Sequence, residues 1–139
     1  MTNRMKIIHE VAMAADAEDF YGQASKFGRL AFQALSHEKR AQITGLENVA
    51  NNSAKVTDVF NYIKTRTARQ KEWQKENLGR ELLNYLEKDL GRRRDELLVK
   101  LAIAKGTPES QEVYIALIRE FVRQLAAQYE YAPFDKERG

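Results

Sequence analysis

The hydrophobic positions of this chain recur with the spacing of α-helices. On the clearest face, apolar residues follow one another at i, i+4, i+7, i+11 and i+15: Phe20, Ala24, Phe27, Ala31 and Leu35. Gly22 and Gly28 lower the helix propensity of this segment, which is consistent with close approach of a neighbouring helix. No segment alternates with period two for long enough to predict a strand, and no proline occurs before Pro108. The pattern therefore predicts an all-α protein.

Capping and loop residues divide the first half of the chain into two helices. We expect a first helix over residues 3–17, with four apolar residues facing inward: Ile8, Val11, Ala12 and Ala15. A second helix starts near Asp19 and frays between residues 40 and 45. Residues 48–53 are expected to form a loop, because Asn and Ser side chains compete for backbone hydrogen bonds.

Two helices are expected in the middle of the chain. Ser53 is a candidate N-cap for a third helix that runs to about Lys75. Asn77 is a candidate cap for a fourth. We favour continuity of this fourth helix through Gly91, because the arginines that follow are good helix formers. It would then end at the glycine of residues 105–106.

The last helix has the strongest start signal in the chain. Thr107 is followed by a proline at the first helical position and by an acid in the first turn, and Pro133 ends the segment. Helices joined by short loops favour an antiparallel bundle. We therefore predict a single-domain bundle of five or six mostly antiparallel helices over residues 1–132, followed by a loose C-terminal tail at residues 133–139.

Positive charge is concentrated in the middle of the chain. The formal net charge is only +3, but residues 54–105 hold 13 basic and 8 acidic residues, a net charge of +5. Residues 1–53 are neutral overall and residues 106–139 carry −2. A field concentrated in one segment attracts a polyanion better than the same charge spread evenly.

Part of this charge falls on one side of the predicted third helix. Five residues lie within a narrow sector at about 100° per residue: Lys55, Tyr62, Arg66, Arg69 and Trp73. The cations would contact phosphates, and the Tyr62 and Trp73 rings would stack on bases. The alternative is a helix flank whose rings pack against a neighbour while its arginines are solvated. A second basic line on the opposite flank comprises Lys64, Lys71 and Lys75.

A second basic cluster is formed by three consecutive arginines, Arg92, Arg93 and Arg94. Such residues spread over about 200° of a helix, so at most two share a face. They could bind phosphates through bidentate contacts. The alternative is local neutralisation by the nearby acids, such as Asp89 and Asp95.

The sequence shows no catalytic or metal-binding pattern. There are no cysteines, the glycines are scattered singly, and neither His9 nor His37 has the spacing of a metal motif. We therefore predict a non-enzymatic protein with no cofactor and no metal. No apolar run approaches the ~20 residues that span a bilayer, and the N-terminal residues lack the pattern of a signal peptide. We expect a cytoplasmic protein without membrane contact.

The final predicted helix places aromatic residues near its end, at Phe121, Tyr129 and Tyr131. With its size, helical content, basic middle and the segment Ser53–Phe60, the chain resembles the small helical subunit of type III CRISPR effector complexes. This resemblance implies a non-catalytic subunit in antiviral defence. Such a subunit would line a filament beside guide and target strands and contact their backbones through lysines and arginines.

The residues and the resemblance lead to one functional prediction and one alternative. We predict a non-catalytic subunit of a larger ribonucleoprotein assembly that binds RNA or another single strand. The candidate nucleic-acid-binding residues are Lys55, Lys64, Arg66, Arg69, Lys71, Trp73, Arg92, Arg93 and Arg94. Other protein subunits, or further copies of this chain, are expected partners. The alternative is a helical protein–protein adaptor or homo-oligomeric scaffold that binds no nucleic acid.

Overall fold

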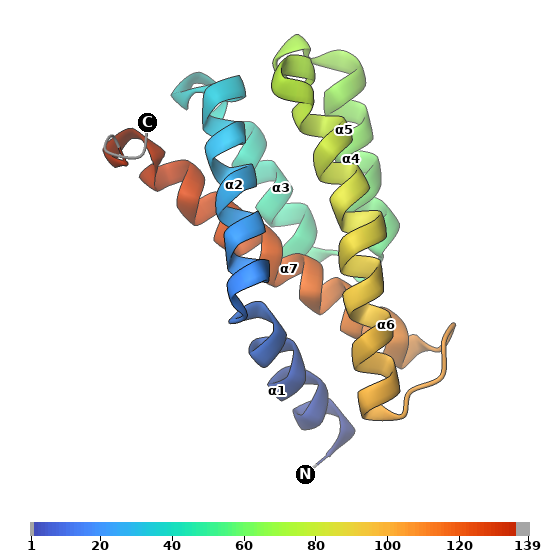
Figure 1. The fold of residues 1–139 in the computed structure, drawn as a ribbon. Helices are drawn as coiled ribbons and strands as arrows, with labels where there is room; N and C mark the ends of the chain where they lie inside the picture. The colour runs from blue at the N-terminus through green and yellow to red at the C-terminus, as the bar shows by residue number, and fades with distance from the viewer. Residues whose placement is uncertain (1, 136–139) are drawn as a thin grey trace.

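The computed structural model describes residues 2–135, and its regular elements in this range are all helical (Figure 1). The α-helices are α1 (Asn3–Ala15), α2 (Glu18–Leu35), α3 (Arg40–Asn52), α4 (Val56–Arg69), α5 (Leu78–Asn84), α6 (Leu90–Leu101) and α7 (Pro108–Tyr131). Short 3₁₀ segments occur at His37–Lys39, Lys71–Asn77 and Ala132–Phe134. The prediction of an all-α protein is confirmed.

The helices α5 and α6 form one continuous rod (Figure 1). A π-helical turn at Tyr85–Asp89 joins them without a break, and Gly91 lies in the first turn of α6. The prediction that the helix continues through Gly91 is therefore confirmed. Counted in this way, the described residues form six helices, which agrees with the predicted bundle of five or six.

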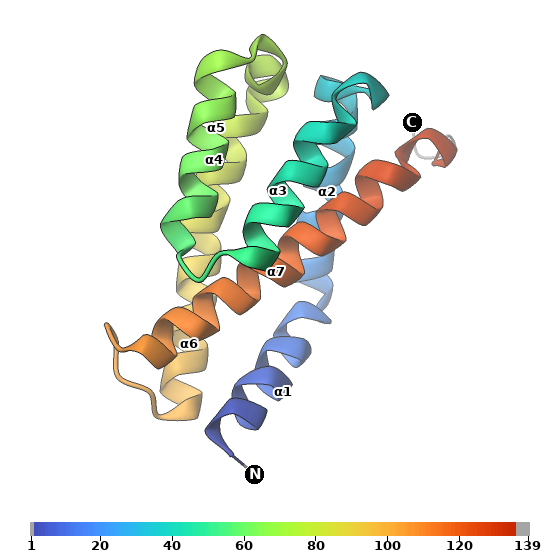
Figure 2. The ribbon, with the colours of Figure 1, turned by 180° about the vertical axis from the view of Figure 1, so that it is seen from behind.

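Helix α7 is central to the fold, because it packs against α1, α2, α3, α4 and α6. The helices α2 and α5–α6 lie on the side nearest the viewer in Figure 1. The helices α3, α4 and α7 lie on the opposite side, which Figure 2 shows. Aromatic contacts join the two sides: the Phe121 ring of α7 stacks on Tyr85 at 4.7 Å between centroids and meets Phe20 edge-on at 5.6 Å.

The predicted inward face was correct for the second helix and half correct for the first, where Val11 and Ala15 are buried as predicted. All five predicted core residues of α2, from Phe20 to Leu35, are buried. In α1, Ile8 is 62% exposed and Ala12 is also exposed. The buried residues of α1 are Ile7, Val11, Ala14 and Ala15. Two adjacent isoleucines offer two possible faces, and packing against α6 and α7 selects the face that contains Ile7.

The loop predicted at residues 48–53 was wrong, because residues 48–52 form the last turns of α3. Ala50 is fully buried in this turn, and the Arg119 side chain of α7 donates to the carbonyls of Ala50 and Ser53 at 2.8 and 2.9 Å. Ser53 is the C-cap of α3, and Lys55 occupies the N-cap position of α4. Tertiary contacts to α7 therefore override the loop preference of this Asn-rich segment.

The third helix was predicted to reach Lys75, but α4 ends at Arg69. Gln70 is extended, and Glu76 and Asn77 adopt left-handed conformations with φ of 53° and 58°. This turn brings α5 back beside α4, and the fit is close: a Cβ on Gly79 would lie 1.8 Å from the Thr67 hydroxyl oxygen.

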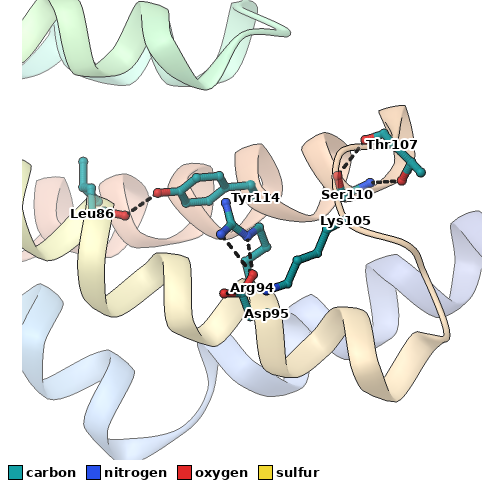
Figure 3. Close-up of polar contacts among 7 residues, drawn as sticks. All are labelled: Leu86, Arg94, Asp95, Lys105, Thr107, Ser110 and Tyr114. Carbon is teal, nitrogen blue, oxygen red and sulfur yellow. Dashed lines mark hydrogen bonds and ion pairs between the residues drawn. The ribbon is translucent and has the colours of Figure 1, made fainter.

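The start of the last helix agrees with the sequence. Thr107 is its N-cap, and the Thr107 hydroxyl accepts from the Ser110 amide at 3.2 Å (Figure 3). The predicted loose tail began at residue 133. Instead, Pro133 and Phe134 belong to the 3₁₀ turn that follows α7. Residues 136–139 of the predicted tail lie outside the described residues.

The contact between α3 and α7 is expected to depend on pH through Glu47. Burial raises the pKa of Glu47, and the Glu130 carboxylate adds to this while Arg123 opposes it. The folded state therefore holds this proton more tightly than the unfolded state, so stability falls as pH rises from about 4 through the folded pKa. We expect Glu47→Gln to raise the melting temperature at pH 7, with the difference closing near pH 4. An equal difference at both pH values in thermal denaturation would contradict this.

Candidate nucleic-acid interface

A surface groove of about 620 Å³ runs between α3 and α4, which lie side by side in Figure 2. Most of its lining residues are polar in type, although most of the surface that they expose to the groove is apolar, and they come from both helices: Asn48, Val49, Asn52, Ser53, Asp58, Asn61, Tyr62, Thr65 and Arg66. The Tyr62 hydroxyl donates to the Gln42 carbonyl at 2.6 Å and so ties the two helices together. The groove therefore has fixed sides that combine amide, hydroxyl and guanidinium groups.

Arg66 is the sequence-predicted residue that lines this groove. Its guanidinium lies 5.2 Å from the centroid of the Tyr62 ring, a cation–π contact. Within residues 2–135 it forms no ion pair with an acidic side chain. This half-buried cation is held in place by an aromatic ring while its charge remains uncompensated, which suits contact with an anion.

The other predicted cations of this region differ in position. Arg69 follows Arg66 by three residues on the same flank of α4, and it is exposed. Lys55 is exposed at the start of α4 and lies 3.8 Å from Asp58. Lys64 lies about 200° around the helix from Arg66, so it faces away from the groove. Lys71 is exposed in the turn that follows α4.

The prediction that Trp73 is a stacking platform was wrong. Its side chain is fully buried, and the indole N–H donates to the Gln42 side-chain oxygen at 2.5 Å. The Tyr62 ring meets it edge-on, with centroids 6.5 Å apart. Because α4 ends at Arg69, Trp73 does not share a helical face with Arg66. The alternative interpretation, in which both rings pack against a neighbour, describes these two residues correctly.

The three consecutive arginines separate into three environments. Arg93 reaches across to α2, where it pairs with Asp19 at 2.6 Å, and it also lies 3.7 Å from Glu96. Arg94 pairs with Asp95 at 3.0 Å, and Lys105 lies 3.8 Å from the same carboxylate (Figure 3). Arg92 is exposed and has no ion pair within the described range. The cluster is therefore neutralised mainly by protein carboxylates.

Arg94 also contributes to the packing of α7 on the π-helical turn. Its guanidinium lies 4.5 Å from the centroid of the Tyr114 ring, and the Tyr114 hydroxyl donates to the Leu86 carbonyl at 2.7 Å (Figure 3). Burial raises the pKa of Tyr114 to about 12, although Arg94 opposes the shift. The phenol thus remains a hydrogen-bond donor at neutral pH, and Arg94 has a structural role here.

The groove contains functional candidates that the sequence did not indicate. Asn48, Asn61 and Thr65 line it, but the asparagines of α3 were assigned to a loop. The spacing of Asn48 and Asn52 at i, i+4 was an available signal, because it places both on one side of a helix. Recognising the groove required knowing that α3 continues to Asn52 and packs beside α4.

The comparisons with known proteins gave no further guidance. No protein-family model, no curated protein and no solved structure matches the chain. In the described part of the chain, no helix is both long and apolar enough to cross a bilayer. Across residues 2–135, no group of three or more His, Cys, Asp or Glu side chains could hold a metal ion.

Proposed function

We propose that the protein binds single-stranded nucleic acid, with RNA as the first candidate, along the α3–α4 face. The observation that carries this proposal is Arg66, a cation without an ion pair among the described residues that is held against the Tyr62 ring in the α3–α4 groove. Arg69 extends the same flank. The net charge of +5 in residues 54–105 would attract a polyanion to this part of the surface.

In this proposal the protein is a non-catalytic subunit of a larger ribonucleoprotein assembly. Arg66 and Arg69 contact phosphates. Lys55, whose exposed pair with Asp58 is long at 3.8 Å, contributes charge at the start of α4. The resemblance to the small subunit of type III CRISPR effector complexes supports a role in antiviral defence beside a guide strand. Arg93 and Arg94 are left out of the proposed surface because protein carboxylates occupy them.

A protein–protein adaptor is the alternative, and the aromatic residues of the last helix would be its natural surface. Three aromatic side chains of α7, those of Tyr114, Phe121 and Tyr129, are buried in the core and unavailable to a partner. Among the described residues at this end of the chain, the exposed aromatic side chains are those of Tyr131 and Phe134. Burial of the other three rings weakens the case for an adaptor surface along α7.

The test is a charge reversal on the proposed surface. We expect Arg66→Glu with Arg69→Glu to weaken binding of a labelled single-stranded RNA by about 10- to 100-fold in fluorescence anisotropy. The log–log dependence of affinity on salt should also become shallower by about 1.4, since two phosphate contacts are lost. The helical circular dichroism signal should not change, because both side chains lie at the surface.

A matched control has the same change in charge on other elements. Lys26 of α2 and Lys88 of the π-helical turn are exposed and lie outside the groove. Lys26→Glu with Lys88→Glu should reduce affinity only slightly. If both double variants lose the same amount of affinity for RNA, the loss comes from the change in overall charge, and the proposed surface is contradicted. Absence of binding by the unaltered protein at low salt would overturn the proposed function itself.

A further inference from the structure

The α3–α4 groove contains hydrogen-bonding groups that the fold does not use. The side chains of Asn48, Asn61 and Thr65 are exposed, and among residues 2–135 they make no hydrogen bond to another protein group, so they are free to contact a ligand. Other polar groups of the groove are occupied: the Ser53 hydroxyl donates to Asp58 at 2.5 Å, and the Asn52 amide donates to the Asn48 carbonyl at 2.9 Å. The unused groups come from both sides of the groove, so a ligand between α3 and α4 could contact all three.

These groups have the chemistry of base recognition rather than of phosphate binding. Phosphate oxygens only accept hydrogen bonds, so an amide uses half of its capacity on them. A base edge offers donors and acceptors side by side, and an Asn amide can pair with both.

Three hydrogen bonds tie the backbone on the two sides of the groove in place. Arg119 fixes the carbonyls of Ala50 and Ser53 at the end of α3, and Tyr62 fixes α4 to Gln42. Because these contacts hold the backbone of both helices, the cost of ordering on binding is limited to the exposed side chains of the groove. A duplex would present its phosphates outward and keep its base edges inside, so this groove suits a single strand.

We infer that the α3–α4 groove binds a single strand with its bases turned inward, where Asn48, Asn61 and Thr65 contact the base edges while Arg66 and Arg69 contact the backbone. This inference rests on the proposed function and adds base recognition to it. It separates two contributions to affinity. The arginine contribution depends on salt and ignores the bases, whereas the amide contribution requires bases and is nearly independent of salt.

An abasic oligonucleotide tests the inference, because it keeps the phosphates and lacks the bases. We expect the unaltered protein to bind a labelled 12-nucleotide single strand of mixed sequence at least about 10-fold more tightly than an abasic strand of equal length. Asn48→Ala with Asn61→Ala should remove most of this difference and leave the salt dependence unchanged. Equal affinity for both strands would overturn base recognition but leave the proposed function intact.

The matched control is Asn51→Ala with Asn84→Ala, which removes two exposed amides that do not line the groove. This variant should retain the preference for the base-containing strand. If it loses the preference as fully as the groove variant does, the amides of the groove have no specific role. If the unaltered protein binds neither strand at low salt, the proposed function fails as well, so the two failures are distinguishable.

Discussion

Replacing Trp73 by alanine is expected to lower the free energy of unfolding by about 3–5 kcal/mol. The indole is fully buried and is among the largest buried side chains of the domain. Its removal leaves a cavity beside Tyr62 and takes the hydrogen-bond donor away from the Gln42 side chain. The measurement is urea denaturation followed by far-ultraviolet circular dichroism. Trp73→Phe, which keeps an aromatic ring, should lower the free energy of unfolding markedly less than Trp73→Ala. A decrease below about 1 kcal/mol for Trp73→Ala would contradict the packing described.

Because Trp73 is the sole tryptophan, the fluorescence of the unaltered protein reports directly on the burial of this indole. A buried indole should emit at short wavelength and resist quenching by iodide in the folded state. Saturating single-stranded RNA should leave its intensity nearly unchanged, since the ring is not available for stacking. Strong quenching by RNA that disappears in the Arg66→Glu, Arg69→Glu variant would place the ring in the binding surface and contradict its burial.

The error at Trp73 shows what a helical pattern cannot reveal. Neither glycine nor proline occurs between Val56 and Leu78, so the sequence carries no strong break signal after Arg69. The chain nevertheless turns there, with Glu76 and Asn77 in left-handed conformations that usually favour glycine. Burial of a large ring beside Gln42, 31 positions earlier in the sequence, accompanies this turn. The local spacing of hydrophobic residues does not reveal a contact between residues so far apart in the sequence.

The candidate site was predictable only in part for a related reason. Arg66 and Arg69 share a flank by helical spacing alone, and the structure keeps them on one surface. The groove beside them depends on the packing of α3, whose final turns were predicted to be a loop. Pairing of Arg93 with Asp19, 74 residues apart, was likewise hidden, because acids near in sequence were the only visible partners. In contrast, the Thr107 start depends on adjacent residues and was correct.

Replacing Gly28 by alanine is expected to destabilise the protein by about 1–3 kcal/mol. A Cβ at this position would lie 2.6 Å from the Leu125 carbonyl oxygen and 2.6 Å from the Cβ of Gln128, both on α7. A backbone carbonyl cannot rotate away as a flexible side chain can, so α2 and α7 must move apart. Their separation would loosen the ring contacts between Phe27 and Phe121, which lie 6.1 Å apart.

Gly22 provides the matched control within the same helix. A Cβ there meets nothing within 4 Å, and alanine is a better helix former than glycine by about 1 kcal/mol. Gly22→Ala should therefore raise the melting temperature, whereas Gly28→Ala lowers it, although both gain the same helix propensity. Thermal denaturation of both variants measures this opposition. Stabilisation by both would show that α2 and α7 can separate at little cost, and it would contradict the close approach at Gly28. Changes in melting temperature of opposite sign would establish that Gly28 is required by the contact with α7 rather than by the conformation of α2.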